Sequence, residues 1–207
     1  MTDFERHLQH GISAHALLVA ALGIPYLLGA LREETLVVAL AVVPITLVGS
    51  VAPDIDHPHA RPYRLATRYV PPATAAVATC LTLKFGGAAI TAVESISVGV
   101  DPLFVAGASV ATVFWVGWWA TSRLFPRLRP SHRTVTHRIS AGMTVAVCLT
   151  TVVVLLLEGT GLPSGLVVRT SALCGGAFLV GFLTHLAGDG LLRDRWRTVS
   201  DRYGLGE

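Results

Sequence analysis

The stretch of sequence that decides the fold is residues 166–187, LVVRTSALCGGAFLVGFLTHLA. Arg169 and His185 interrupt a run that is otherwise made of apolar and small residues. A helix needs about 20 predominantly apolar residues to cross the hydrocarbon core of a bilayer. The stretch therefore predicts a membrane-spanning helix.

Apolar stretches of this kind recur along the chain. The other candidates are residues 13–31, 35–52, 70–85, 102–121 and 139–157, of which 70–85 is the shortest and contains two prolines near its start. Charged residues make up only 14% of the chain, against about 25% in a typical soluble domain. We therefore expect an all-α, polytopic membrane helix bundle with about six transmembrane helices, forming a single domain over residues 1–207.

The distribution of basic residues predicts the orientation. All but three of the 16 Lys and Arg residues fall on one set of connections and termini of a six-helix topology, the exceptions being Arg32, Lys84 and Arg169. Lys and Arg accumulate in cytoplasmic loops. We therefore predict that the protein lies in the plasma membrane and that both of its termini are cytoplasmic. The formal net charge of +3 is too small to indicate nucleic-acid binding, and we expect none.

All eight histidines fall at the predicted cytoplasmic ends of the helices or in the adjoining connections. An ionisable residue in a membrane segment is costly and indicates function. His7, His10 and His59 are expected to be solvated. Three clusters and one further histidine, His15 at the start of the first apolar stretch, remain as candidates for chemistry.

The first cluster, at residues 49–58, is GSVAPDIDHP. Asp54 and Asp56 lie between prolines that prevent a continuing helix, so both carboxylates can face one centre from a tight loop. The alternative is an ordinary turn, in which Asp and Pro are common.

The second cluster, at residues 131–138, is SHRTVTHR. His132 and His137 are candidate ligands, because histidine is the usual nitrogen ligand of zinc and related metals. The alternative is a basic loop that only sets orientation. Arg133 and Arg138 fit either interpretation, since guanidinium groups also bind phosphate.

The third cluster, at residues 181–190, is GFLTHLAGDG. His185 and Asp189 are four residues apart and share one helix face, so they can serve one metal as two ligands or as a ligand and its supporting carboxylate. The alternative is a helix end at which histidine interacts favourably with the helix dipole.

A metal explains these clusters together. Three aspartates and several imidazoles left unpaired near the membrane would cost on the order of 10 kcal/mol, and a bound divalent ion returns about 10 to 16 kcal/mol in structural zinc peptides. Zinc is expected, although such ligands also admit manganese or iron. The predicted ligands or their immediate supports are His15, Asp54, Asp56, His132, His137, His185 and Asp189.

The three motifs resemble a known family, the inner-membrane metal-dependent hydrolases whose bacterial members are described as LexA-binding. The resemblance rests on G-x-x-x-P-D-I-D-H-P at residues 49–58, H-R-x-x-T-H at 132–137 and G-F-x-x-H-x-x-x-D at 181–189, with His15 in the first helix. The suggested relationship of that family to zinc-dependent phospholipase C and P1-type nucleases implies an all-helical site with two or three metals that acts on phosphate esters.

The leading hypothesis is therefore a membrane-embedded metal-dependent hydrolase that opens to the cytoplasm. A metal-bound water with its pKa lowered to about 7 would be the nucleophile. Arg133 or Arg138 would stabilise charge that develops on a phosphoryl group, and His57 would be a second base or an extra ligand. The expected substrate is an anionic ester, such as a phosphate ester or a phospholipid headgroup, met among the membrane lipids.

Two other classes of function remain open. One is a non-catalytic membrane protein with a structural metal and a cytoplasmic protein partner, which a closed four-ligand site would favour. The other is a metal-ion transporter, which would need ionisable residues near the middle of the bilayer. The central parts of the predicted helices offer little beyond Ser, Thr, Cys and Gly, so this class is the less favoured.

Overall fold

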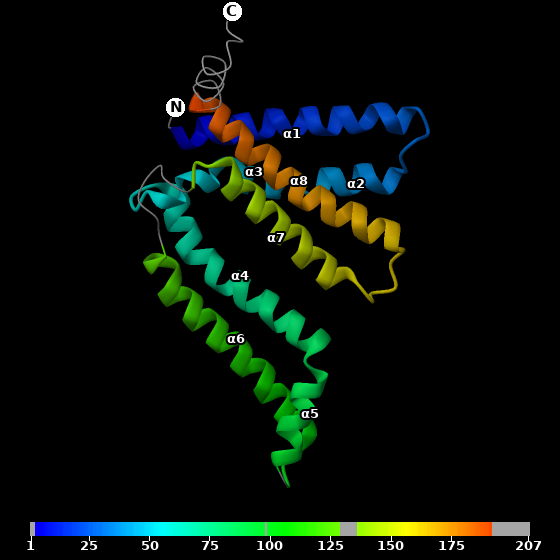
Figure 1. The fold of residues 1–207 in the computed structure, drawn as a ribbon, viewed down its shortest axis with the longest axis vertical. Helices are drawn as coiled ribbons and strands as arrows, with labels where there is room; N and C mark the ends of the chain where they lie inside the picture. The colour runs from blue at the N-terminus through cyan, green and yellow to red at the C-terminus, as the bar shows by residue number, and fades with distance from the viewer. Residues whose placement is uncertain (1–2, 98, 129–135, 192–207) are drawn as a thin grey trace, which may run out of the picture. The chain divides into compact units, whose positions relative to one another are not determined.

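The computed structural model describes residues 3–97, 99–128 and 136–191, and these residues are helical with no strand among them. This confirms the all-α prediction. The elements in chain order (Figure 1) are α1 (Asp3–Leu27), α2 (Glu33–Ala41), α3 (Val43–Val51), the 3₁₀ helix η1 (Ala52–Asp56), α4 (Arg61–Phe85), α5 (Gly87–Ile96), α6 (Pro102–Arg127), α7 (Ile139–Leu157) and α8 (Ser164–Gly188).

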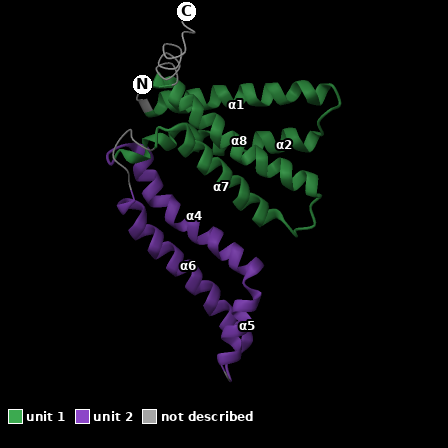
Figure 2. Ribbon diagram, viewed as in Figure 1, with its two compact units in different colours: residues 1–57, 130–207 green, residues 58–129 purple. Residues whose placement is uncertain are grey.

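The chain forms two compact units, coloured separately in Figure 2. Unit 1 comprises residues 1–57 and 130–207 and contains α1, α2, α3, η1, α7 and α8. Unit 2 comprises residues 58–129 and contains α4, α5 and α6. A single domain over residues 1–207 stays a prediction.

The helices have the length and composition of membrane spans. Four of them, α1, α6, α7 and α8, are individually long and apolar enough to cross a bilayer. The pair α2 and α3 with η1 is bent by 41°, and the pair α4 and α5 is bent by 79°. If each bent pair is one span, the number rises to six. The chain is thus consistent with a membrane protein, and six spans with cytoplasmic termini stay a prediction.

Two helices begin nine or more residues before the apolar stretches that predicted them. Helix α1 begins at Asp3, well before residue 13, and α4 begins at Arg61, with Pro71 and Pro72 inside it. Hydropathy marks the part of a helix suited to hydrocarbon, whereas the helix itself continues for as long as its backbone hydrogen bonds do. This difference places the polar N-terminal residues of α1 on a helix.

Helix α8 lies at the centre of unit 1, where it packs against α1, α2, α3 and α7. Phe178, Phe182 and Leu186 of α8 form a buried cluster with Ala146 of α7. In all, 10 of the 25 residues of α8 are buried.

Two glycines allow α3 and α8 to approach closely. A Cβ atom at Gly49 would overlap the carbonyl oxygen of Phe178, and one at Gly181 would overlap the carbonyl oxygen of Thr46. Small residues let helix backbones meet in membranes, where van der Waals packing replaces the hydrophobic effect as the driving force for association. This crossing fixes the end of α8 that carries His185 against the end of α3.

Candidate metal centre

His185 on the last turn of α8 is fully buried, and one of its two ring nitrogens is hydrogen-bonded to the backbone. Its Nδ1 lies 2.9 Å from the backbone carbonyl oxygen of Ser50 in α3. A carbonyl oxygen only accepts, so Nδ1 carries the hydrogen and donates it. In the neutral ring, this leaves Nε2 with an unprotonated lone pair, the form in which histidine binds a metal.

The Nε2 atom of His185 faces two carboxylates. It lies 3.6 Å from Oδ1 of Asp54 and 3.4 Å from Oδ2 of Asp189. The atom is buried and has no hydrogen-bond partner within the described part of the chain. The electrostatic potential between this lone pair and the two carboxylates is strongly negative. A cation bound there would stabilise the arrangement.

The distances fit a metal ion better than a shared proton. Two ligand atoms bound at about 2.1 Å to one tetrahedral ion lie about 3.4 Å apart. Charge-assisted hydrogen bonds between nitrogen and oxygen are shorter, at about 2.7 to 2.9 Å. The 3.4 and 3.6 Å separations around His185 Nε2 match the first arrangement.

Among the described residues, two groups of side chains have the geometry to hold an ion, and they share His185. One group is His7, His185 and Asp189, and the other is Asp54, His137 and His185. The ligand atoms within each group all lie within 4.8 Å of one another. The five residues come from α1, η1, the connection before α7, and the end of α8, all within unit 1.

His7 is the residue of this centre that sequence reasoning missed. The prediction that it is solvated is wrong, because only 5% of it is exposed. Its ring stacks on that of His185 with centroids 3.9 Å apart, and its Nε2 lies 3.4 Å from Oδ1 of Asp189. The available signal was the spacing of His7, Gly11 and His15, which places all three on one broad face of a helix. Gly11 on that face packs against Ser50.

His137 is supported by a buried carboxylate. Asp56, which is 2% exposed, accepts a hydrogen bond from Oγ1 of Thr136 at 2.6 Å and lies 3.7 Å from Nδ1 of His137. The other nitrogen of His137, Nε2, lies 3.8 Å from Oδ2 of Asp189. Burial lowers the pKa of His137, against the opposing effect of Asp56, so the neutral ligand form is favoured. Oγ1 of Thr136 also lies 3.2 Å from Nδ1 of His137, so Asp56 is placed to orient His137 through Thr136.

His15, a predicted ligand, lies outside both groups. Its Nδ1 is 2.7 Å from Oγ1 of Thr46, and its Nε2 is 2.9 Å from the carbonyl oxygen of Ala39. Ala39 and Thr46 lie on either side of the break between α2 and α3 at Val42, and Pro44 follows in the first turn of α3. With both nitrogens engaged in this way, His15 links α1 to the two halves of the bent pair.

Two more of the predicted residues, His57 and Arg138, are not part of either group. His57, at the end of η1, and Arg138, at the start of α7, are exposed. His132 and Arg133 lie outside the described residues. His10 and His59 are exposed, as expected for solvated histidines.

The centre is closed on its imidazole side and open on its carboxylate side. The side chains of His137 and His185 are 4% and 0% exposed, whereas those of Asp54 and Asp189 are both 23% exposed. Water or a small anion can therefore approach the carboxylate edge while the imidazoles stay shielded.

No family model, no curated protein and no solved structure matches the chain. Three features of the described residues meet the chemical requirements of a metal site. His185 has its tautomer set by a backbone carbonyl, carboxylates lie at ligand spacing, and a supporting carboxylate lies behind His137. The chain thus has His/Asp groups able to hold a metal ion.

Proposed function

We propose that the protein is a membrane-embedded metal-dependent hydrolase that cleaves an anionic ester, such as a phosphate ester or a phospholipid headgroup. The observation that carries the proposal is the buried Nε2 atom of His185, which has no hydrogen-bond partner among the described residues and faces Asp54 and Asp189. The resemblance of the three motifs to inner-membrane metal-dependent hydrolases supports the same reaction class. We place the centre at the cytoplasmic face of the plasma membrane, as the distribution of basic residues predicts.

The open carboxylate edge supports a catalytic rather than a structural role. Structural zinc sites are closed by four protein ligands, whereas catalytic sites keep one position for water or substrate. Here Asp54 and Asp189 remain partly exposed beside fully shielded imidazoles. This exposure allows a substrate to reach the ligand edge.

The residues of the centre have distinct roles in this proposal. His7, His137 and His185 hold zinc or a similar divalent ion from the shielded side, and Asp54 and Asp189 hold it from the open side. When bound, such an ion lowers the pKa of water and polarises the ester. Asp189 has one oxygen toward His7 and the other toward His137 and His185, so it ties the two groups together.

The charge of the centre depends on the number of ions that it holds. Asp54, Asp56 and Asp189 carry three negative charges when ionised, so one divalent ion leaves the centre at −1 and two leave it at +1. With two ions, the pocket would attract an ester that bears negative charge. Arg138 at the start of α7 is a candidate for contact with a phosphoryl group. Arg133 is a second candidate, because it belongs to the same sequence cluster at residues 131–138.

The decisive experiment measures metal content and hydrolysis on the same samples. Purified full-length protein, Asp54→Ala and His185→Ala are compared with the matched control His59→Ala, which alters an exposed histidine outside both groups. We expect wild type and His59→Ala to retain zinc or a related metal and to hydrolyse a member of a panel of phosphate esters and phospholipids. Asp54→Ala and His185→Ala should lose both the bound metal and the hydrolysis.

Full metal content in both site variants would overturn the proposed centre. Metal lost in those variants, with no hydrolysis of any ester by the wild type, would instead support a structural metal in a protein that recruits a cytoplasmic partner. Topology is tested separately by labelling a cysteine placed at His59 from either side of sealed vesicles, and labelling from the periplasmic side would contradict a cytoplasmic centre.

A further inference from the structure

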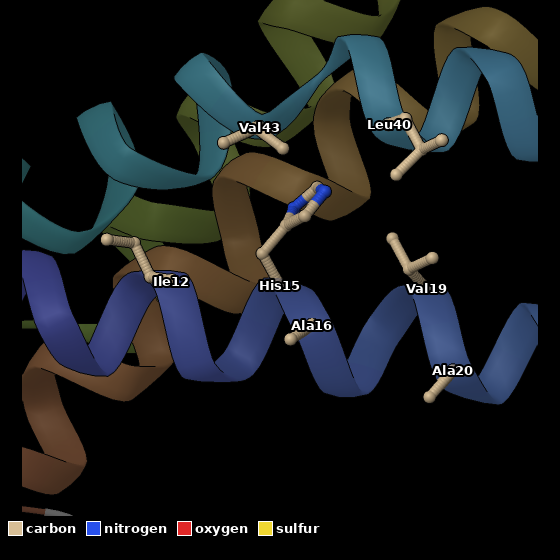
Figure 3. A pocket seen from close by; sticks show the side chains of 7 residues that line it. All are labelled: Ile12, His15, Ala16, Val19, Ala20, Leu40 and Val43. Atoms are coloured by element: carbon tan, nitrogen blue, oxygen red, sulfur yellow. The ribbon is translucent and has the colours of Figure 1, made fainter.

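A cavity of about 460 Å³ lies between α1 and the bent pair α2 and α3. Figure 3 shows Ile12, His15 and Val19 directed from α1 toward Leu40 and Val43 on the opposite side. The volume falls within the range of about 300 to 1,000 Å³ that is usual for ligand sites. Its lining residues are Ile12, His15, Ala16, Val19, Ala20, Leu40 and Val43.

The lining is suited to hydrocarbon alone. Six of its seven side chains are aliphatic. The seventh belongs to His15, whose two nitrogens are already bonded to Thr46 and Ala39. No side chain of the lining therefore has a free hydrogen-bonding group, and a polar ligand would lose its contacts with water without replacement.

The position of the cavity indicates where the hydrocarbon comes from. Both walls belong to candidate membrane spans, α1 on one side and the bent pair on the other. Ile12 and Leu40 at the cavity are 55% and 59% exposed, and Leu17 and Val37 on the same helices are 71% and 65% exposed. Such surfaces lie in hydrocarbon when the helices span a bilayer, so the available occupant is lipid.

The size of the cavity favours a single chain over a helix. Ile12 to Ala20 cover about 12 Å along α1 at 1.5 Å per residue. A helix segment of that length, about 10 Å in diameter, would fill roughly 900 Å³. This is about twice the cavity volume of 460 Å³, whereas a flexible hydrocarbon chain is much thinner.

We propose that this groove binds one hydrocarbon chain of a membrane phospholipid. The inference depends on the membrane location of α1, α2 and α3 and not on the chemistry of the metal centre. Ala16 and Ala20 contribute the smallest lining side chains from α1, and Leu40 and Val43 line the groove from the bent pair.

The test places full-length protein in phosphatidylethanolamine and phosphatidylglycerol vesicles that contain a phospholipid with a diazirine on one acyl chain. After photolysis, labelled peptides are mapped by mass spectrometry. We expect enriched labelling of the peptides that hold Ala16, Ala20 and Val43, above the labelling of exposed positions such as Leu103 in α6.

Two variants fill the groove and one matched variant does not. Ala16→Phe and Ala20→Phe place a ring at lining positions of the groove, whereas Ala21→Phe adds the same ring one residue further along α1, at an exposed position outside the groove. Labelling around Val43 should fall to the level of Leu103 in the first two variants and remain at the wild-type level in the third. Metal content, measured on the same samples, should be unchanged in all three.

Uniform labelling of all exposed faces, or labelling near Val43 that persists in Ala20→Phe, would overturn the proposal. Adducts that join α1 of two copies of the chain would show that a second copy covers the groove, and would overturn it as well. Because metal content is measured independently, a failure of this inference is distinguishable from a failure of the proposed hydrolase function.

Discussion

Helices α6 and α8 are alike in sequence character and differ in burial. They contain 26 and 25 residues, with hydropathy values of 1.6 and 1.8 over their most apolar windows. Only 6% of that window is buried in α6, against 44% in α8. Hydropathy therefore identifies both as candidate spans but does not tell which one a neighbouring helix covers.

The placement of glycine accounts for the difference. A Cβ atom at Gly107 in α6 would meet no other described residue within 4 Å, and one at Gly117 would meet only Ala75. Gly175 and Gly181 in α8 lie directly against backbone atoms of α7 and α3. Close contact at these glycines buries α8 and keeps His185 away from lipid. In this chain, the positions of small residues, more than those of apolar ones, decide where the polar centre forms.

The largest effect is expected for Gly181→Ala. Its new methyl group would overlap the backbone of Thr46, which cannot move without shifting α3. We expect a loss of about 1 to 3 kcal/mol in unfolding free energy, as for overpacking, together with reduced metal content because Ser50 moves away from His185. Thermal unfolding in detergent and metal analysis measure the two effects.

The controls for Gly181→Ala come from both helices. Gly176→Ala in α8 and Gly107→Ala in α6 add the same methyl group where no neighbouring described residue lies within 4 Å. Both should be neutral or slightly stabilising, because alanine favours helix. Equal stability of Gly181→Ala and Gly176→Ala would refute the explanation of burial by close glycine contacts.

Asp56→Asn should weaken the metal centre without removing a ligand. Asp56 lies behind His137, and loss of such an orienting carboxylate typically lowers metal affinity by about 10- to 100-fold. Competition with a chelator measures the affinity. The same substitution at Asp101, which caps the start of α6 far along the chain from the centre, should leave the affinity unchanged. Complete loss of metal in Asp56→Asn would indicate that Asp56 binds the ion directly.

Thr46→Val should destabilise the fold and spare the metal. The substitution removes the hydroxyl that is bonded to Nδ1 of His15, at a cost of about 1 kcal/mol. Chemical denaturation in detergent measures the loss. Thr112→Val in α6, where the hydroxyl bonds only within its own helix, is the matched control and should cost less. A large fall in metal content for Thr46→Val would return His15 to the set of candidate ligands.

The smallest effect is expected for Phe104→Leu in α6. Phe104 is 70% exposed, so the change should stay within about 0.5 kcal/mol. The matched change Phe178→Leu in α8 alters a side chain that is 5% exposed and should cost about 1 kcal/mol. Unfolding midpoints that do not differ between the two would remove the energetic distinction between these helices.

The fold and much of the centre were predictable from the sequence for separate reasons. The apolar stretches predict the helices because lipid requires them, and the structure brings Asp54, His137, His185 and Asp189 together as the motifs suggest. His7 was missed because it precedes the apolar part of α1, where hydropathy gives no helix. The spacing of His7, Gly11 and His15 places them on one helix face, but the burial of that face depends on contacts with α3 and α8, which are distant in sequence.

His15 and Asp56 show the opposite difficulty, because both were predicted as ligands and the structure gives them other partners. A histidine and a carboxylate look the same in sequence whether they bind an ion or another residue. Only tertiary contacts reveal that His15 is bonded to Thr46 and Ala39, and that Asp56 accepts a hydrogen bond from Thr136. The type of ligand can be read from a motif, but its partner depends on distances between segments far apart in the chain.

The hydrogen bond from His185 to the peptide of Ser50 does not use the side chain at position 50. A substitution there can break the bond only by moving the backbone, because Ser50 is fully buried and Gly11 packs against it. What can break the contact is separation of α3 from α8. Occupancy by metal would then report whether these two helices have assembled in the bilayer, and would offer a readout of membrane folding in intact cells.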